Sequence, residues 1–342
     1  MNAVFEFWNE QYSVSRPLEV DSWLSRVLNR HVVAALLNTF PFAATRVFSM
    51  SRGELAQRLC VGREGGSYRV LRAMYEFNDP GRRGDIINRV FMQSPAVKAA
   101  RNRRSIAERI LEVCLKNQPA DLPILVLALG GGDGHIEAGP IARSPRQDVY
   151  YCSVDKDDKS IEDHGQVMEQ HGLAERSFVF SGDVTEKTDL HAVLEAARER
   201  FRVNFDGVRI AACHGIAEYM DIDQPENETL AKMLEAVHDC VSPEGNLIIS
   251  HTDFHDRVQY MERGLQWKMR LRSMEELEAE IEKAGWQIAL CDHEPMRLIT
   301  MCLAVKSERQ HRRIDSPSYI RRPHATRLIR AGSPSVAAAP AR

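Results

Sequence analysis

The sequence predicts an α/β protein in which a doubly wound, seven-stranded sheet follows an all-helical N-terminal domain. Residues 124–129, ILVLAL, are six uncharged apolar residues in a row, which is typical of a strand buried on both faces of a parallel sheet. From Leu122 onward such strand-like runs alternate with helical ones, whereas residues 1–118 show mostly helical periodicity. We therefore expect a helical domain over 1–118, a sheet domain over 119–306 and a disordered basic tail over 307–342.

The composition is that of an ordinary soluble globular protein, with 44% hydrophobic and 27% charged residues in a chain of 342. A formal net charge of −3 gives no global attraction to nucleic acid or to an anionic membrane. No window approaches ~18 uninterrupted apolar residues. Glu6 and Glu10 stand where a signal peptide would need a basic and then an apolar region. We expect a cytoplasmic protein with no membrane partner and no nucleic-acid partner.

Seven cysteines are scattered along the chain, and none forms a C-x-x-C pair. The odd number and irregular spacing argue against a disulfide framework or a zinc knuckle and fit a reducing cytosol. Cys152, Cys291 and Cys302 fall within apolar, strand-like runs. We expect these three to be small hydrophobic residues of the core.

The predicted sheet is built from seven apolar runs separated by turn or helix signals. The helix before the sixth run begins with a capping box of Ser273 and Glu276 and ends at Gly285. Pro140 requires the helix after the first run to be short or kinked. The expected strands cover residues 124–129, 149–154, 177–180, 208–213, 246–250, 286–291 and 298–305.

A glycine-rich turn, GGGDG, follows the first predicted strand. Gly130, Gly132 and Gly134 let the backbone turn sharply and approach a ligand closely, which a Cβ would block. A strand, a turn of this kind and a helix N-terminus together form the start of a nucleotide site. Asp155 ends the second strand, 21 residues beyond Gly134, and a carboxylate there can accept both ribose hydroxyls. A plain surface aspartate is the alternative for Asp155.

Residues 51–77 have helix-turn-helix spacing. Ser51 and Glu54 are expected to form a capping box at the first of these helices. The second helix carries Arg69 and Arg72, which could read DNA, although the net charge does not favour it.

The next helix carries a cluster of four arginines. We expect a solvated or salt-bridged face, with contact to an acidic substrate as the alternative. The four are Arg101, Arg103, Arg104 and Arg109.

Residues 122–306, with the x-x-G-x-G-x-G turn and Asp155, resemble the Rossmann-like class I S-adenosylmethionine (SAM)-dependent methyltransferases. The resemblance implies that SAM is the cofactor and that Asp183, after the third strand, contacts adenine. Segment 51–77 is similar to the winged-helix part of small-molecule O-methyltransferases, which dimerises and closes the substrate pocket. The chain departs from the family at Ala128, where many members have an acid. The implied cofactor-binding residues are Gly130, Gly132, Asp133, Gly134, Asp155 and Asp183.

The function implied by this resemblance is methyl transfer from SAM to a small molecule. Tyr12, with Trp8 four residues earlier, could lie over the cationic sulfonium as an aromatic lid, or could simply pack.

The family places the segment after strand four beside the transferred methyl group, so His214, Glu218 and Tyr219 are catalytic candidates. His214 has an ordinary pKa that suits proton removal, although a histidine packed at the sheet edge is equally expected. His251, after strand five, is the fourth candidate.

Three other functions stay open. The turn with Asp133 is also similar to the aminopropyltransferases, which use decarboxylated SAM but carry an acid-rich sequence after strand four, where this chain has only Glu218. Other relatives transfer an aminocarboxypropyl group or cyclise SAM, releasing methylthioadenosine. A helix-turn-helix regulator with a nucleoside-sensing domain is the third.

A metal site is the remaining possibility for the segment after strand five. His251, Asp253 and His255 point to one side if that segment is extended, and two histidines with a carboxylate can hold a metal. Substrate contact or an ordinary loop explains the same residues, and no metal is expected.

Overall fold

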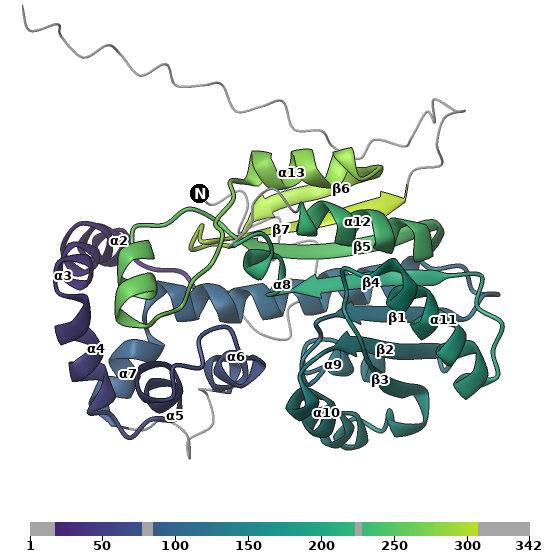
Figure 1. Ribbon diagram of the computed structural model, residues 1–342, viewed down its shortest axis with the longest axis horizontal. Helices are drawn as coiled ribbons and strands as arrows, with labels where there is room; N and C mark the ends of the chain where they lie inside the picture. Colours follow the sequence, from purple (N-terminus) through teal and green to yellow (C-terminus); the bar gives the residue numbers. More distant parts are fainter. Residues whose placement is uncertain (1–17, 77–84, 223–227, 307–342) are drawn as a thin grey trace, which may run out of the picture. The chain divides into compact units, whose positions relative to one another are not determined.

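The computed structural model describes residues 18–76, 85–222 and 228–306 (Figure 1). Tyr12, Trp8 and the predicted tail lie outside the described residues.

A seven-stranded sheet with the order β3-β2-β1-β4-β5-β7-β6 confirms the predicted fold class. Only β7 runs antiparallel to its neighbours; the other adjacent strands are parallel. β5 starts five residues earlier than expected, because Val241 already pairs with Val208 before a register shift. The strands are β1 (Ile124–Leu129), β2 (Val149–Asp155), β3 (Ser177–Ser181), β4 (Val208–His214), β5 (Val241–Thr252), β6 (Trp286–His293) and β7 (Ile299–Lys306).

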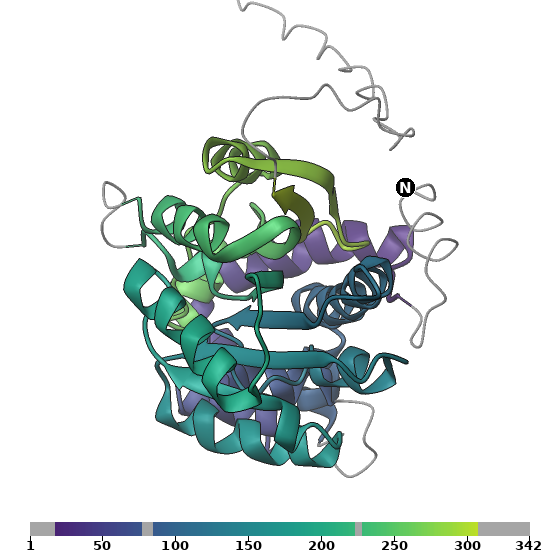
Figure 2. The same ribbon diagram turned by 90° about the vertical axis from the view of Figure 1, so that its right-hand side faces the viewer.

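Helices cover both faces of the sheet (Figures 1 and 2). One face packs against α11 (Lys187–Phe201), α12 (Thr229–Cys240) and α13 (Met274–Lys283). The other packs against α8 (Pro95–Asn117), α9 (Ala138–Arg143) and α10 (Asp158–Gln170). Helix α9 has six residues, as the position of Pro140 in its first turn requires.

A third core lies among the N-terminal helices and takes residues from three distant parts of the chain. Leu55 and Val70 belong to the helix-turn-helix segment, whereas Tyr260, Leu265 and Trp267 follow β5. The division at residue 118 therefore stays a prediction, because the helical core also uses a later segment. The helices before β1 are α2 (Trp23–Leu28), η1 (Asn29–Val33), α3 (Ala34–Thr39), α4 (Pro41–Ser49), α5 (Glu54–Ala56), η2 (Gln57–Val61), α6 (Tyr68–Tyr75) and α7 (Ile86–Met92). Three short helices lie later in the chain, η4 (Ala174–Arg176), η5 (Ala217–Tyr219) and η7 (Tyr260–Gly264).

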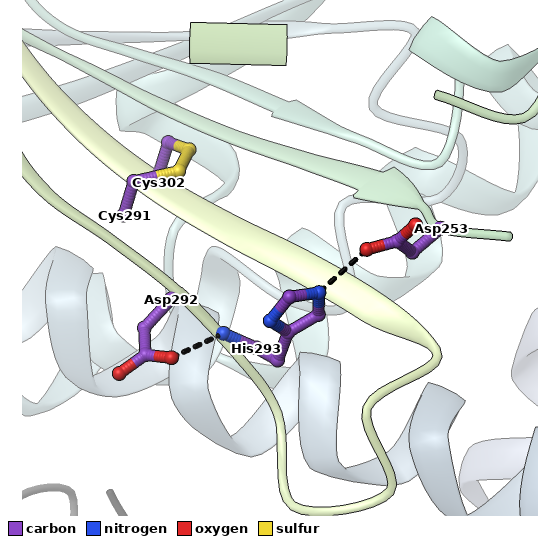
Figure 3. Close-up of a disulfide and its surroundings, with 5 residues drawn as sticks. All are labelled: Asp253, Cys291, Asp292, His293 and Cys302. Atoms are coloured by element: carbon purple, nitrogen blue, oxygen red, sulfur yellow. Dashed lines mark hydrogen bonds and ion pairs between the residues drawn. A yellow bond between two sulfur atoms is a disulfide. The ribbon is translucent and has the colours of Figure 1, made fainter. Parts of the chain in front are cut away.

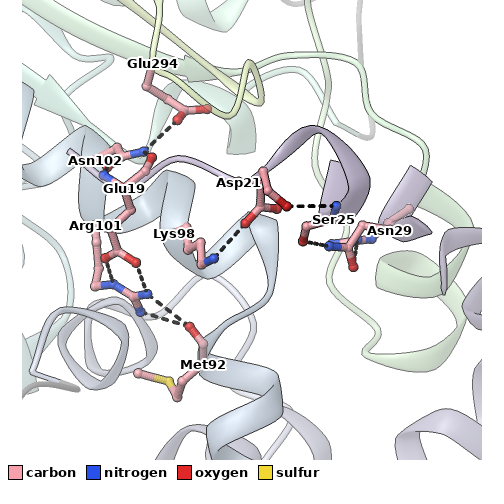
Figure 4. Close-up of polar contacts among 11 residues, drawn as sticks. Glu19, Asp21, Ser25, Asn29, Met92, Lys98, Arg101, Asn102 and Glu294 are labelled. Carbon is pink, nitrogen blue, oxygen red and sulfur yellow. Dashed lines mark hydrogen bonds and ion pairs between the residues drawn. The ribbon is translucent and has the colours of Figure 1, made fainter. Parts of the chain in front are cut away.

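The arginines of α8 are buried, so the expected solvated face is wrong. The exposed fractions of all four lie at or below 8%. Arg101 binds the carboxylate of Glu19 (Figure 4). Arg104 donates to Glu108 at 2.6 Å. Salt bridging, which was the other half of the expectation, is confirmed for Arg101, for Arg104 and for Arg103, whose Nη1 lies 3.5 Å from Oε1 of Glu218.

Helix α8 also fixes the hairpin between β6 and β7 (Figure 4). The Asn102 side chain donates to Glu294 at 3.1 Å, and the backbone amides of Met296 and Leu298 donate to the same carboxylate. Burial raises the pKa of Glu294 above its usual value, and these donors oppose the shift.

The two predicted capping boxes have opposite outcomes. Ser273 and Glu276 form theirs at the start of α13, and Gly285 follows its end with φ +92°, as predicted. The prediction of a capping box at Ser51 is wrong. The Ser51 hydroxyl donates to Asp85 at 2.8 Å, and Gly53 is the N-cap of α5.

Cys291 and Cys302 form a disulfide, which corrects their assignment as simple core residues (Figure 3). The two residues face each other directly in the register of β6 and β7, with Cα atoms 4.1 Å apart. The remaining cysteines of the described residues are free and buried.

Candidate functional site

The parallel register brings several chain segments to one edge of the sheet. Leu129, the last residue of β1, is aligned with Val154 of β2 and with Cys213 of β4. His214 in turn pairs with Ser250 of β5. The glycine turn, the end of β2 and the segments after β4 and β5 therefore leave the sheet at the same edge, where ligands bind in open α/β folds.

The glycine turn needs glycine at its three predicted positions. Gly130, Gly132 and Gly134 have φ values of +58°, +57° and +72°, which other residues rarely adopt. A Cβ on Gly130 would lie 2.4 Å from Ile216, and one on Gly134 would lie 2.3 Å from Met168. The turn is therefore packed tightly between the segment after β4 and helix α10.

Asp155 is joined to the turn by a hydrogen bond. Its Oδ2 accepts from the Gly132 amide at 2.9 Å, and its Oδ1 accepts from the Asp157 amide at 2.9 Å. The side chain is only half-buried, and each carboxylate oxygen can accept more than one hydrogen bond. Asp155 is thus held in one orientation with acceptor capacity left for a ligand's hydroxyl groups.

Asp183 lies near Asp155, since Asp155 pairs with Ser181 at the end of β3. Its Oδ1 accepts from the Thr185 amide at 2.9 Å and from the Thr185 hydroxyl at 2.8 Å. The hydrogen bond from the Thr185 amide is the largest effect and lowers the pKa of Asp183. Asp183 is ionised at neutral pH, and Oδ2 carries none of these bonds.

Asp133, the residue that interrupts the glycines, points into the protein and is 5% exposed. Its Oδ1 accepts from the His135 amide at 3.2 Å, and its Oδ2 lies 3.6 Å from Nη1 of Arg72. Burial raises the pKa of Asp133 to about 6, and Arg72 opposes the shift. Arg72 also binds Glu76 at 2.9 Å, so one of the two arginines considered for DNA reading faces the turn.

Tyr68, at the start of α6, is a residue of this site that the sequence did not reveal. Its hydroxyl donates to Oδ2 of Asp163 on α10 at 2.8 Å. A Cβ on Gly132 would lie 2.8 Å from the Cβ of Tyr68. Helix α6 of the N-terminal region therefore lies directly over the glycine turn.

Glu218, on η5 after β4, is a buried carboxylate beside the turn. Its Oε1 accepts from Nη1 of Arg103 at 3.5 Å and from the Thr252 hydroxyl at 3.3 Å, while its Oε2 has no partner. Burial raises the pKa of Glu218 above its usual value, and Arg103 opposes the shift. Arg103 also donates to the Tyr75 hydroxyl at 3.0 Å, so α8 and α6 both contribute to this cluster.

The two candidate histidines are buried and neutral. Burial lowers the pKa of His214 to about 3 and that of His251 to about 3. Nδ1 of His214 has no hydrogen-bond partner. A histidine with so low a pKa is a weak base at neutral pH. The burial of His214 therefore favours Glu218 over His214 for proton removal.

Tyr219 contacts the segment that follows β5. Its hydroxyl accepts a hydrogen bond from Nε1 of Trp267 at 2.7 Å, and burial raises its pKa well above the usual value. Tyr219 is therefore protonated at neutral pH and can donate a hydrogen bond.

The three residues considered as metal ligands do not converge. Asp253 binds Nε2 of His293 at 2.5 Å (Figure 3), and Nδ1 of His255 accepts from the Arg257 amide at 3.1 Å. His251 is buried separately in β5. Within residues 18–76, 85–222 and 228–306, no group of three His, Cys, Asp or Glu side chains is placed to hold a metal ion.

Residues 23–306 match the family described as "Putative methyltransferase", and the chain belongs to this family. The strand order of the sheet agrees with the class I methyltransferase fold that the sequence predicts. The chain is also 20% identical over 279 residues to YnbC, an uncharacterized protein of Escherichia coli K12. That match covers 78% of this chain and 44% of YnbC, so the chain spans less than half the length of this relative.

The solved structures similar to this chain include the following two. A structure described as a possible exported protein from Bordetella parapertussis has 17% sequence identity and a TM-score of 0.59, with 83% of this chain and 92% of that chain covered. At this identity the likeness shows a shared fold. The carbon methyltransferase CurJ has 12% identity and a TM-score of 0.49, with 90% and 79% covered.

Proposed function

We propose that this protein binds SAM on the glycine turn and transfers its methyl group to a small molecule held beside Glu218. The observation that carries the proposal is the hydrogen bond between the Gly132 amide and Asp155. It fixes a carboxylate against the turn at the ligand-binding edge of a class I sheet.

The residues at this edge fit the adenosine part of SAM. Asp155 has acceptor capacity for ribose hydroxyls, and Oδ2 of Asp183 is available to an exocyclic amine. Gly130 and Gly134 allow the left-handed φ values of the turn on which the cofactor would lie. When bound, SAM supplies a methyl carbon that its sulfonium has already activated toward a nucleophile. The contribution of Tyr12 to the same site stays a proposal from the sequence.

In the proposed reaction, the protein aligns the nucleophile and accepts its proton. Glu218 is the candidate base, because burial raises its pKa and its Oε2 has no partner. Arg103 positions that carboxylate. We propose that Tyr219 and the neutral His214 form hydrogen bonds with the substrate, and His251 stays a candidate from the sequence.

We propose that the substrate is a small molecule because helices α6 and α8 lie against the site. Tyr68 of α6 lies on the glycine turn, and Arg103 of α8 reaches Glu218. A site covered in this way fits a compact substrate better than a protein or a nucleic-acid strand. Arg72 faces Asp133 and is therefore turned toward the glycine turn. This leaves the helix-turn-helix segment with one fewer arginine that could contact DNA.

Calorimetry with SAM tests the cofactor site. Asp155→Ala removes two charge-assisted hydrogen bonds to ribose and should weaken binding about 100-fold. Asp158→Ala changes an exposed carboxylate three residues later and should leave the affinity unchanged. Equal affinities of wild type and Asp155→Ala would refute the ribose assignment.

The products formed from SAM test the reaction. Incubation with SAM and a metabolite extract should release S-adenosylhomocysteine, and Glu218→Gln should slow its release while calorimetric binding of SAM persists. Methylthioadenosine as the product would replace methyl transfer by aminocarboxypropyl transfer or SAM cyclisation.

We also propose a cytoplasmic location, because five cysteines of the described residues are free and buried. This location predicts that Cys291 and Cys302 are thiols in the cell despite their pairing in the structure. Alkylation of intact cells, followed by mass spectrometry with and without reductant, measures their state. A bridge present in cells would place the protein in an oxidising compartment.

A further inference from the structure

Helix α6 and the glycine turn meet at an ion pair that is left open. Tyr68 and Arg72 are four residues apart on α6, so their side chains lie on the same side of that helix. Tyr68 lies against Gly132, and Arg72 faces Asp133, the next residue of the turn. Nη1 of Arg72 is 3.6 Å from Oδ2 of Asp133, whereas a charge-assisted hydrogen bond measures about 2.7–2.9 Å. The two charges therefore face each other without closing a hydrogen bond.

Asp133 is a buried acid whose second oxygen is not hydrogen-bonded. Its exposed fraction is 5%, and its Oδ1 accepts from the His135 amide. No donor from the described residues reaches its Oδ2. A buried carboxylate costs free energy unless donors satisfy both of its oxygens. A ligand that carries a cationic donor would complete this group.

Arg72 likewise has donors beyond those that its contacts with the protein use. Its Nε binds Glu76 at 2.9 Å, and its Nη1 faces Asp133. The guanidinium group has five N–H donors in one plane, and a carboxylate can accept two of them side by side. Nη2 carries neither of these contacts, and the side chain is 28% exposed. The carboxylate of a ligand can therefore reach the guanidinium group.

The open pair lies next to the place proposed for SAM. The Gly132 amide donates to Asp155, the proposed ribose acceptor, and Asp133 is the neighbouring residue along the chain. Neighbouring Cα atoms are about 3.8 Å apart, so different parts of one small ligand can reach both acids. Besides adenosine and the sulfonium, SAM has an amino-acid end that carries an ammonium and a carboxylate group at neutral pH. The residues assigned above to adenosine leave this end without a partner.

We propose that Asp133 and Arg72 hold the amino-acid end of SAM. The ammonium group donates to Oδ2 of Asp133, and the carboxylate accepts from the guanidinium group of Arg72. A zwitterion is complementary to a separated ion pair, so each buried charge gains a partner of opposite sign. This inference rests on the proposed function, because it takes SAM as the ligand of the turn.

The pair also gives the site a preference between two forms of the cofactor. Decarboxylated SAM keeps the ammonium group and lacks the carboxylate, so it satisfies Asp133 and leaves Arg72 without its partner. A site built to pair a polar group rejects a ligand that lacks this group. Arg72 is therefore the residue that favours SAM over the decarboxylated form used in aminopropyl transfer.

Calorimetry with two nucleosides tests the amino-acid site. S-adenosylhomocysteine and methylthioadenosine share adenosine and a thioether, but only the first has the amino-acid end. At pH 8, above the pKa of about 6 of Asp133, wild type should bind S-adenosylhomocysteine about 100-fold more tightly. Asp133→Asn and Arg72→Gln should each reduce this ratio about tenfold and leave the affinity for methylthioadenosine unchanged. Arg89→Gln, at an exposed arginine of α7, is the matched control and should keep the ratio of wild type.

Decarboxylated SAM separates the two residues. Wild type should bind it about tenfold more weakly than SAM. Arg72→Gln should abolish this difference, whereas Asp133→Asn should weaken both ligands and keep it. Equal affinities of wild type for SAM and for decarboxylated SAM would overturn the role of Arg72.

The failure of this inference can be told apart from the failure of the proposed function. Equal binding of the two nucleosides by wild type would overturn the amino-acid site and leave the adenosine site standing. Weaker binding of both nucleosides to the same extent in Asp133→Asn and Arg72→Gln would make the pair a purely structural contact. Asp155→Ala should weaken both nucleosides alike, because both contain the ribose. If wild type bound neither nucleoside, the proposed function and the amino-acid site would both be wrong.

Discussion

Replacing Asp133 by asparagine should stabilise the protein at neutral pH. Asp133 is buried in the glycine turn, and its Oδ2 has only the distant Arg72 guanidinium for compensation. Asparagine has nearly the same shape and carries no charge into the interior. The substitution therefore removes the cost of a buried carboxylate and keeps an acceptor for the His135 amide.

The size of the effect follows from the pKa. Burial raises the pKa of Asp133 from 3.8 to about 6, so the folded protein binds the proton more tightly than the unfolded chain does. The stabilisation that comes from this tighter proton binding by Asp133 is fully present below about pH 4 and is lost as the pH rises through 6. A shift of about two units corresponds to about 3 kcal/mol of unfolding free energy. Asp133→Asn should exceed wild type by about this amount at pH 8 and equal it at pH 4.

Urea denaturation at a series of pH values, followed by circular dichroism, measures this difference. Asp121→Asn, which changes an exposed carboxylate before β1, is the control and should give a curve parallel to wild type. If the unfolding free energy of Asp133→Asn also changed with pH in parallel with that of wild type from pH 4 to pH 8, Asp133 would not be a buried acid with a raised pKa.

Three further substitutions test the packing. Arg103→Met leaves Glu218 buried without its cation and should lower the free energy of unfolding in urea by about 3–5 kcal/mol. Adding Glu218→Gln should recover part of this loss. An Arg103→Met variant as stable as wild type would exclude a buried ion pair. Gly134→Ala forces a left-handed φ and a Cβ contact at 2.3 Å. It should cost about 2–4 kcal/mol, whereas Gly165→Ala on α10 should be neutral or stabilising in the same melt. Ser273→Ala should lower thermal stability by about 1 kcal/mol through loss of the α13 cap, and an unchanged melting temperature would contradict that role.

The features predicted correctly from the sequence depend on neighbours along the chain. An uncharged apolar run marked β1, and the pair Ser273 and Glu276 marked the start of α13. The position of Asp155 at the sheet edge was predicted because the residue directly follows an apolar run; its role toward a ligand stays a prediction.

The incorrect predictions depend on residues distant in sequence. Ser51 has the pattern of a capping box, but its hydroxyl binds Asp85, 34 residues later. Arg103 was expected in a solvated or salt-bridged helix face; the salt bridge is present, but its partner Glu218 lies 115 residues away and could not be identified from the sequence. Helical periodicity contains no signal for such pairs, because they form only when segments distant in sequence pack together. Cys291 and Cys302 lie in the last two predicted strands, and they pair because these strands are neighbours in the sheet with the two cysteines opposite each other.

The composition of the helical core has a consequence for synthesis of the protein. Leu55 and Val70 pack with Tyr260, Leu265 and Trp267, which leave the ribosome much later. At roughly 5–20 residues per second, roughly 10–40 s separate the synthesis of Val70 from that of Trp267. During this interval the nascent N-terminal helices lack part of their core and expose apolar side chains. A nascent chain shorter than about 260 residues is thus a target for chaperones, and the helical region reaches its final packing only after β5 has been made.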